Sequence, residues 1–224
     1  MKEEKTYCDT SKLSIRLITK SVAKDIIVNN HYSGLWTKVS YAIGLFTSDV
    51  EEHPFFDNVE DKLIGVACYG DPIGRSAGQS ISPLLERTEV LELTRLFVFD
   101  DYGSNIESWF LGQTFNWLRE NVPHIKGLIS YSDPKEGHCG TIYQATNWLY
   151  TGATKARTDI ASLNGKHPRH HAGDRTKRVF RSAKHRYVFM HGNKKERKGL
   201  NRALRYGTES YPKKQIDPYN GNEE

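Results

Sequence analysis

Residues 125–153 read IKGLISYSDPKEGHCGTIYQATNWLYTGA, and this stretch decides the fold. Its first eight residues are largely apolar and predict a buried strand that ends just before Asp133. Two glycines then permit a tight turn, after which residues 139–146 predict a short helix and residues 147–153 a turn and a strand. Because ligands of open α/β sheets bind at the carboxyl ends of strands, we expect functional side chains in this turn.

Asp133 and Tyr143 are the first candidate catalytic residues. Asp133 follows the buried strand, where a carboxylate can serve as a general base or orient another group. Tyr143 comes ten residues later, on the short helix, and can donate a proton to a leaving group. Each has a structural alternative, because Asp133 can close an Asx turn before Pro134 and Tyr143 can be a half-buried core residue.

The rest of the chain alternates between strand and helix patterns. Strands are predicted at 12–19, 39–47, 62–69, 90–99 and 186–191, and helices at 21–29, 104–122 and 194–206. The helix that starts near residue 104 has the clearest signal, because Ser104 and Glu107 fit a capping box and apolar residues follow at helical spacing. The order of elements predicts an α/β fold with mixed sheet pairing and a core over residues 10–155.

Length and composition limit the class of protein. A chain of 224 residues suits one domain, and 37% apolar residues with four Trp, twelve Tyr and nine Phe can build a core. No apolar run approaches the ~20 residues that span a bilayer, so we expect no membrane partner. Three cysteines without a CxxC motif argue against a disulfide framework and a thiolate zinc site, as expected in a reducing compartment.

The net charge of +5 hides a marked asymmetry along the chain. Residues 1–150 hold 14 Lys and Arg against 20 Asp and Glu, a net of −6, whereas residues 151–224 hold 18 against 7, a net of +11. The sequence therefore predicts a basic C-terminal extension over 156–224, with a last strand and helix, that contacts nucleic acid. The alternative is a solvated basic tail. The candidate phosphate-contacting residues are Arg169, Arg175, Lys177, Arg178 and Arg181.

Four segments resemble the phage Mom family, whose members have a fold like that of GNAT acyltransferases. They are NNHYSG at 29–34, ELTRLFV at 92–98, SNIES at 104–108 and YSDPKEGHCGTIYQATNWLYTG at 131–152. The resemblance implies a GNAT-like mixed central sheet flanked by helices. It also implies a transferase that adds a carbamoylmethyl (acetamido) group to N6 of adenine in double-stranded DNA, which protects phage DNA from restriction. Such a protein would work in the cytoplasm of the infected bacterial host.

The resemblance also assigns site residues. His31, Tyr32, Asp133 and Tyr143 are implied to be catalytic, and Arg95 and Ser108 to bind substrate or cofactor. Adenine N6 is a poor nucleophile and is out of reach of a deep pocket while the base is stacked, so we expect base flipping and a proton acceptor. Further residues expected to hold the base or the donor are Asn105, Trp36 and Tyr41, and core packing is the alternative for the aromatic ones.

The group donor stays open, with acetyl-CoA and a glycine-derived compound as candidates. The turn at 99–105 holds one Gly and two carboxylates, which would repel the pyrophosphate of acyl-CoA. The Gly-containing segment 70–78 is a weak phosphate-loop signal, and an ordinary loop is the alternative. The resemblance implies that a metal such as iron is to be considered, with His31 and Tyr32 as a ligand pair or as a base-reading pair, and His138 as another ligand.

Two other functions compete with DNA adenine modification. The first is an ordinary GNAT N-acyltransferase that acts on a small-molecule, protein or tRNA amine, and it requires acyl-CoA binding. The second is a non-enzymatic DNA-binding protein, in which Asp133 and Tyr143 would have no catalytic role. A homodimer is a further expectation for the assembly.

Overall fold

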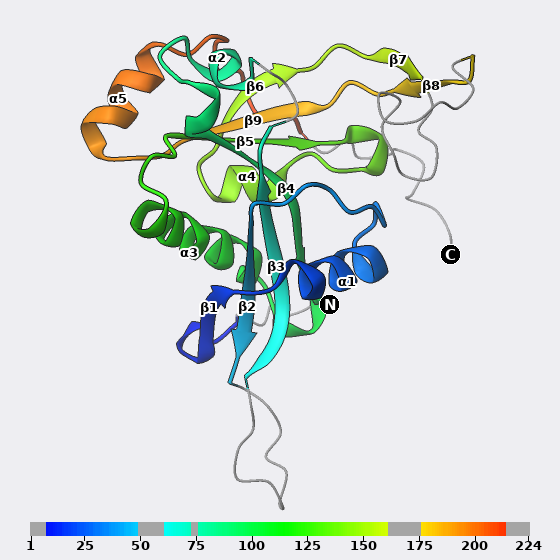
Figure 1. The fold of residues 1–224 in the computed structure, drawn as a ribbon, viewed down its shortest axis with the longest axis vertical. Helices are drawn as coiled ribbons and strands as arrows, with labels where there is room; N and C mark the ends of the chain where they lie inside the picture. Colours follow the sequence, from blue (N-terminus) through cyan, green and yellow to red (C-terminus); the bar gives the residue numbers. More distant parts are fainter. Residues whose placement is uncertain (1–7, 49–60, 73–75, 161–175, 214–224) are drawn as a thin grey trace, which may run out of the picture.

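The computed structural model describes residues 8–48, 61–72, 76–160 and 176–213, and a seven-stranded sheet forms its centre (Figure 1). The strands lie in the order β1-β2-β3-β4-β5-β9-β6, and every neighbouring pair is antiparallel except β4 with β5. This mixed sheet with flanking helices confirms the predicted α/β fold class. Its strands are β1 (Leu13–Leu17), β2 (Tyr41–Thr47), β3 (Lys62–Gly70), β4 (Val90–Val98), β5 (Gly127–Ser132), β6 (Leu149–Ala153) and β9 (His185–Met190).

A second sheet has two strands, β7 (Arg157–Ile160) and β8 (Arg178–Arg181), which pair antiparallel and lie beyond β6 and β9 (Figure 1). We call this pair the β7–β8 ribbon. The helices are α1 (Lys20–Asn30), α2 (Ala77–Ile81), α3 (Ile106–Asn121), α4 (Thr141–Ala145) and α5 (Lys194–Arg202). Single 3-10 turns lie at η1 (Thr10–Lys12), η2 (Arg87–Glu89), η3 (Asp100–Tyr102) and η4 (Pro134–Glu136). None of the helices in the described residues combines the length and apolar character that a membrane crossing requires.

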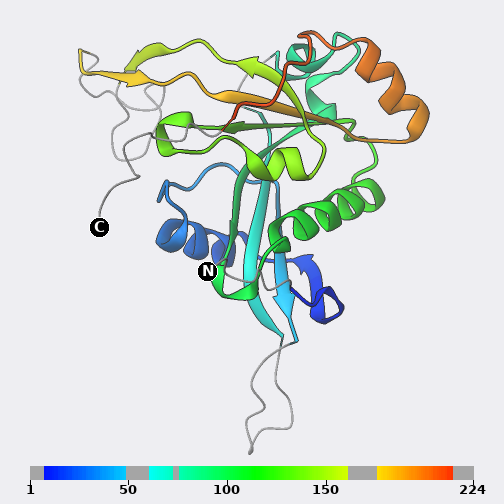
Figure 2. The same cartoon turned by 180° about the vertical axis from the view of Figure 1, so that it is seen from behind.

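Helices α1 and α3 cover opposite faces of the sheet (Figures 1 and 2). Successive side chains of a strand point to opposite faces, so Ala42 packs with Ile27 of α1 while Ile43 joins the cluster that contains Phe110 of α3. The α3 side holds the larger cluster, which includes the fully buried Trp148. Burying side chains of this size stabilises the fold by roughly 1.5–3 kcal/mol each.

Strands β4 and β5 separate after a short paired segment. Their register covers three residue pairs and ends at Glu92 opposite Ile129. On the other edge of β4, Cys68 faces Arg95 and the next residue of β3 faces Leu93, so Thr94 is an extra residue that forms a β-bulge. A bulge bends its strand, and here it lies where β4 leaves β5.

The sheet extends across the boundary predicted at residue 155. Strand β9 belongs to the predicted 156–224 extension, yet it lies between β5 and β6. Tyr187 and Val188 of β9 are almost fully buried, and Leu200 of α5 packs into the same cluster as Val188. The last strand and helix were predicted, but the basic composition gave no sign that they belong to the core. Strand β9 and Leu200 of α5 are therefore part of the core that had been bounded at residue 155.

The structure corrects the starts of two predicted helices. The expected capping box at Ser104 does not form, because Asn105 is the N-cap with a left-handed φ of 68° and makes no side-chain capping bond. Helix α1 begins one residue before the predicted start. Its N-cap is Thr19, whose hydroxyl oxygen accepts the Val22 N–H at 3.4 Å.

Candidate active site

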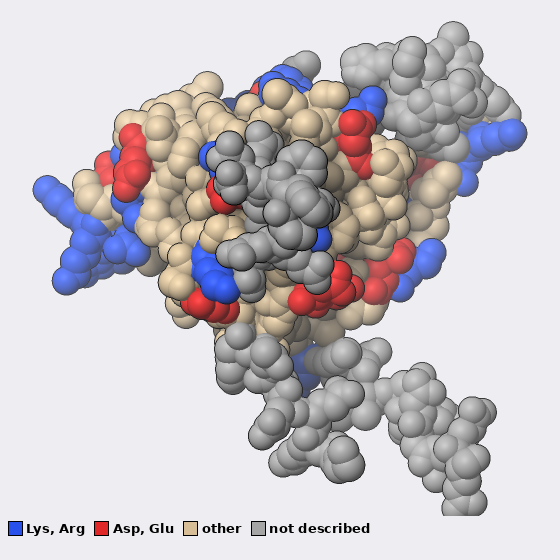
Figure 3. Space-filling model, turned by 90° about the horizontal axis from the view of Figure 1, so that it is seen from below, with Lys and Arg blue, Asp and Glu red and all other residues tan. Residues whose placement is uncertain are grey.

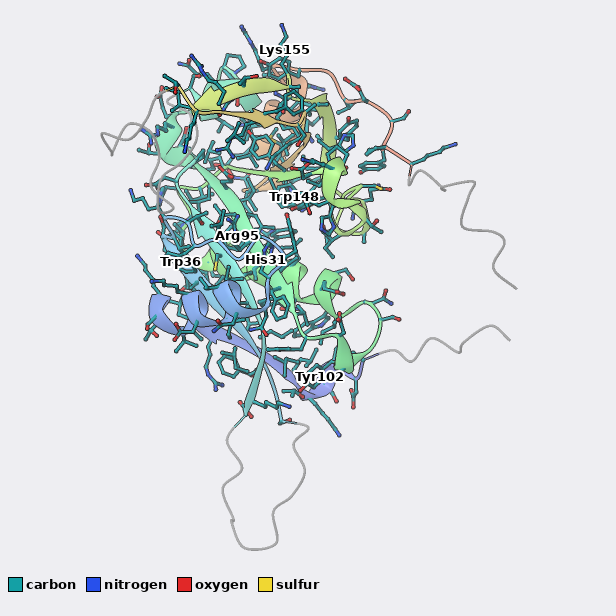
Figure 4. The ribbon with its side chains drawn as sticks, turned by 90° about the vertical axis from the view of Figure 1, so that its right-hand side faces the viewer. His31, Trp36, Arg95, Tyr102, Trp148 and Lys155 are labelled. Carbon is teal, nitrogen blue, oxygen red and sulfur yellow. The ribbon has the colours of Figure 1, made fainter. Side chains whose placement is uncertain are left out.

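A cavity of about 810 Å³ opens where β4 and β5 separate. Its walls come from the end of α1, the second half of β4, the start of α3 and the segment from β5 to α4. His31 and Arg95 lie close together in this region (Figure 4). The polar or charged lining residues are Asn30, His31, Tyr32, Thr94, Arg95, Asp100, Asn105, Glu107, Ser108, Tyr131, Ser132, His138, Cys139, Thr141 and Tyr143.

Most of the predicted catalytic and substrate-binding residues meet in this cavity. Its lining includes His31, Tyr32, Arg95, Asn105, Ser108 and Tyr143. Trp36 and Tyr41 lie elsewhere. Trp36 packs against the cluster under α1, and Tyr41 contacts the Trp117 ring at 5.9 Å on the α3 side. Both rings therefore serve packing, which was the alternative for these residues.

Three aromatic rings lie against one another at the cavity wall with interplanar angles of 32° and 43°, and we call this tilted group the aromatic stack. The Tyr32 ring lies 4.2 Å from the His31 ring and 4.7 Å from the His138 ring, measured between centroids. The stack joins the end of α1 to the turn before α4, two segments far apart in the sequence. Tyr32 is 60% exposed, so this stack presents aromatic surface to an incoming planar group.

The hydrogen bonds of His31 determine its protonation. Its Nδ1 accepts the Ser33 N–H at 3.2 Å and lies 2.9 Å from the Ser33 hydroxyl. Nδ1 therefore needs its lone pair, and the proton of the neutral ring is on Nε2. Burial, together with the charges of Arg95 and His138, lowers the pKa of His31 to about 4. At neutral pH the ring is uncharged and offers an N–H donor.

The hydrogen bonds of His31 also bear on metal binding. A metal at Nε2 would require the tautomer with the proton on Nδ1, which can donate to the Ser33 hydroxyl 2.9 Å away. Burial raises the pKa of Tyr32, so its phenol is protonated when no metal is bound. Within the described residues no group of three or more His, Cys, Asp or Glu side chains is arranged to hold a metal.

Arg95 is the cationic residue of the cavity wall. Its Nε donates to the carbonyl of Leu35 at 3.1 Å, and a terminal nitrogen donates to the carbonyl of Thr94 at 2.6 Å. The bulge at Thr94 turns that carbonyl out of the strand ladder and makes it available. Burial lowers the pKa of the Arg95 guanidinium, and none of the described carboxylates forms an ion pair with it. The site can therefore hold an anionic or carbonyl oxygen of a ligand.

Tyr143 is held by a hydrogen-bond chain that ends on β4. The Ser130 hydroxyl donates to the carbonyl of Leu93 at 2.8 Å, and the same oxygen lies 2.7 Å from the Tyr143 hydroxyl. A hydroxyl has one proton, so Tyr143 must be the donor to Ser130. Burial raises the pKa of Tyr143 to about 12. Its phenol is thus protonated, and the proton is engaged in the hydrogen bond to Ser130. The phenol oxygen therefore presents a lone pair to the cavity.

Asp133 is not among the residues that line the cavity. Its Oδ1 accepts the Ser182 hydroxyl at 2.8 Å and the Lys135 N–H at 3.1 Å, and its Oδ2 lies 3.6 Å from the Lys184 ammonium. Burial acts to raise the pKa of Asp133, but these hydrogen bonds and the lysine charge outweigh it and hold the pKa below its usual value. The Lys135 bond is the Asx-type turn that was the alternative for this residue.

The cavity contains two carboxylates that the sequence did not assign to catalysis. Asp100 begins η3 and Glu107 lies in the first turn of α3, and both line the cavity. Glu107 carried only a capping signal in the sequence. Ser130 was also missed, because a serine in an apolar strand gives no signal until its partner Tyr143 is brought beside it.

The chain is similar to a known family of proteins. Residues 12–213 match the Mom protein family, which is most of the chain. The chain belongs to the Mom family.

One curated Mom relative is similar in sequence. It is the methylcarbamoylase Mom of Escherichia phage Mu, 25% identical over 145 residues. The match covers 64% of this chain and 55% of the relative, so it spans about half of that protein.

Solved structures resemble this Mom-family chain more distantly. A spermidine/spermine N-acetyltransferase from Vibrio cholerae is 10% identical with a TM-score of 0.47, covering 87% of this chain and 98% of its own. A ribosomal-protein-S5-alanine acetyltransferase from Vibrio fischeri is 11% identical with a TM-score of 0.48, covering 84% and 97%.

The predicted DNA-contacting residues of this Mom-family chain are partly described. Lys177, Arg178 and Arg181 are exposed on or beside β8, whereas Arg169 and Arg175 lie outside the described residues. Figure 3 shows one group of basic side chains on the α5 side and another on the side of the β7–β8 ribbon, with both acidic and further basic side chains between them. Basic residues therefore lie at both ends of the upper part of the sheet.

Proposed function

We propose that this Mom-family chain is a phage transferase that adds a carbamoylmethyl group to N6 of adenine in double-stranded DNA. The observation that carries the proposal is the cavity between β4 and β5, where the residues shared with the family resemblance meet. The family membership and the name of the Mu relative support the same reaction. We place this activity in the cytoplasm of the infected host.

The aromatic stack suits a flipped base. An adenine turned out of the duplex can lie against Tyr32 and His138, with the Nε2–H of His31 as a donor to a ring nitrogen. An adenine that stays stacked in the duplex cannot enter the cavity, so flipping precedes transfer.

The transfer step requires a proton acceptor. A bond forms between N6 and the methylene carbon of the donor, the donor's leaving group departs with the bonding electrons, and N6 loses one proton. Asp100 and Glu107 are the carboxylates of the cavity wall, and we assign the acceptor role to one of them. Asp133 is the weaker candidate, because both of its oxygens are engaged by Ser182, Lys135 and Lys184.

The donor is proposed to bind through Arg95, whose guanidinium can hold a carbonyl or carboxylate oxygen. Acetyl-CoA and a glycine-derived compound both carry such an oxygen. Direct transfer from acetyl-CoA would join N6 to the carbonyl carbon, with the thiolate leaving, so the methylene bond above requires a glycine-derived donor with a leaving group on its methylene carbon. Asp100 and Glu107 disfavour the pyrophosphate of acetyl-CoA at the start of α3. Feeding expressing cells with heavy-isotope glycine or acetate, and locating the label in the modified base, distinguishes the two.

Nucleoside mass spectrometry tests the proposal. DNA from host cells that express the chain is digested, and a carbamoylmethyl-deoxyadenosine peak is expected. Arg95→Met should lower that peak strongly, with Arg87→Met, an arginine outside the cavity lining, as the matched control. An unchanged adenine pool in cells with confirmed expression would refute DNA adenine modification.

A further inference from the structure

The two faces of the β7–β8 ribbon differ in chemistry. Directly paired residues share a face, and the register places Arg157 opposite Arg181 and Asp159 opposite Val179. On this face the Asp159 carboxylate lies 3.2 Å from Arg157 and 3.3 Å from Arg181. Both arginines on this face are therefore paired with a carboxylate inside the ribbon, and a net charge of +1 remains.

The other face carries an aromatic ring and a cation. Phe180 is 66% exposed and lies opposite Thr158, and Arg178 lies opposite Ile160. Arg178 is exposed and forms no ion pair with any residue that the structure describes. An exposed ring beside an unpaired arginine complements a polyanion whose interior is a stack of apolar bases.

The base of the ribbon is tied to the cavity rim. Ser182 and Lys184 follow β8 and bind the Asp133 carboxylate, at 2.8 Å and 3.6 Å. The Lys184 N–H also donates to the Thr154 hydroxyl at 2.9 Å. This bond joins the segment before β7 to the segment after β8, at the base of the ribbon. Asp133 begins the turn that carries His138 of the aromatic stack. The ribbon is thus held at a set position relative to the cavity.

We propose that the β7–β8 ribbon is a DNA-opening arm and that the Phe180 ring inserts into the base stack beside the target adenine. Arg178 contacts the backbone phosphate next to the insertion. This inference rests on the proposed function, because it names how the duplex delivers a base to the same cavity. Asp133 is a positioning residue in this scheme, since it acts through the ribbon and the rim.

Insertion of an apolar side chain separates neighbouring bases and kinks the duplex, which lowers the cost of flipping the adjacent nucleotide. Loss of the ring should therefore matter on stacked DNA and matter little on DNA whose bases are already unstacked. A residue that only contacted phosphates would affect both kinds of DNA alike.

Two variants separate these cases. Phe180→Ala removes the ring, and Val179→Ala removes an apolar side chain of the same strand on the opposite face. Phe180 is 66% and Val179 44% exposed, so neither change leaves a core cavity. The purified full-length proteins are mixed with a duplex that carries 2-aminopurine in place of adenines, whose emission rises on unstacking. In parallel, host lysates with matched expression receive plasmid DNA or its separated strands, and modified adenine is counted by mass spectrometry.

The wild type and Val179→Ala should raise 2-aminopurine emission and modify both DNA forms. Phe180→Ala should lose the emission rise and modify duplex DNA about tenfold less, while its activity on single strands stays within twofold of wild type. Equal loss on both DNA forms, or no loss on either, overturns the proposal. A dimer that Phe180→Ala dissociates while duplex opening is unchanged also overturns it, since the face would then belong to a second copy. An emission rise without modified adenine leaves the arm in place and refutes the proposed function instead.

Discussion

Hydrogen bonds around single residues determine where the protons of the cavity lie. The Ser130 hydroxyl donates to the Leu93 carbonyl and therefore accepts a hydrogen bond from the Tyr143 hydroxyl. The Nδ1 of His31 accepts a hydrogen bond from the Ser33 N–H. Tyr143 is thus an acceptor toward the cavity and His31 a donor. This assignment reverses the direction that the sequence suggested for Tyr143, which was expected to release a proton to a leaving group.

Removing the Tyr143 hydroxyl tests this direction. Tyr143→Phe should lower the modified-adenine level about tenfold, as expected for the loss of one hydrogen bond to a ligand. Tyr150→Phe is the control, because Tyr150 lies on β6 and outside the cavity lining. A loss of about 10² to 10⁴-fold would instead indicate general acid catalysis by Tyr143.

His31 should make stability depend on pH. Its pKa is about 4 in the fold and near 6.5 in the unfolded chain, so the unfolded state binds more protons between these values. The contribution is present above about pH 6.5 and is lost as the pH falls toward about 4. Because the side chain is half-buried, solvent screening reduces it to about 1–2 kcal/mol.

Urea unfolding of wild type and His31→Gln across this range measures the effect. The free energy of unfolding of the wild type should fall more steeply toward acid than that of the variant. Burial also lowers the pKa of His191, so some acid sensitivity should remain in both proteins. Parallel curves for the two proteins would contradict a depressed pKa at His31.

At the scale of elements, the separation of β4 from β5 creates the cavity. The bulge at Thr94 bends β4 where the pairing with β5 ends, so Leu93 pairs with β3 and has no partner residue on β5. Ser130 of β5 restores a partner to the Leu93 carbonyl through its side chain. The Leu93 carbonyl, on the edge of β4 that faces the cavity, therefore has a hydrogen-bond partner although no strand pairs with it there.

Ser130→Ala should therefore destabilise the whole fold. The substitution leaves the buried Leu93 carbonyl and the Tyr143 hydroxyl without this partner, at a cost of about 2–3 kcal/mol. Guanidinium unfolding gives the value. Ser48→Ala, an exposed serine that donates to Lys12, should change stability by less than about 0.5 kcal/mol. Equal effects of the two substitutions would argue against the chain from Tyr143 to Leu93.

At the scale of the molecule, the charges are segregated. The acidic first 150 residues contain most of the cavity, and the basic last third carries the β7–β8 ribbon and α5. The ribbon and α5 lie toward opposite ends of the upper sheet (Figure 1). Only one of these basic regions adjoins the Asp133 turn, so DNA contacts should be unequal between them.

Salt titration of duplex binding checks this inequality. Replacing both Lys177 and Arg178 by Ala should reduce the slope of log affinity against log salt by about 1–2. Replacing Lys194 and Lys195 of α5 by Ala removes the same charge and should leave the slope nearly unchanged. The reverse pattern would move the DNA-binding surface to α5.

The sequence determined much about the elements and the family. Apolar periodicity located the strands of the sheet and α3, and the motifs around His31, Arg95 and Tyr143 indicated residues that do line one cavity. These features are local, because strand and helix patterns and short motifs depend on neighbouring residues. The charge split likewise follows from composition alone.

Tertiary structure decided the rest. The place of β9 inside the sheet, the separation of β4 from β5 and the bond from Ser182 to Asp133 join residues far apart in the chain. No local pattern encodes such pairings, because they depend on which strand edges meet. For the same reason the sequence left Trp36, Tyr41 and Asp133 as site candidates, whereas packing and hydrogen bonds place all three outside the cavity lining.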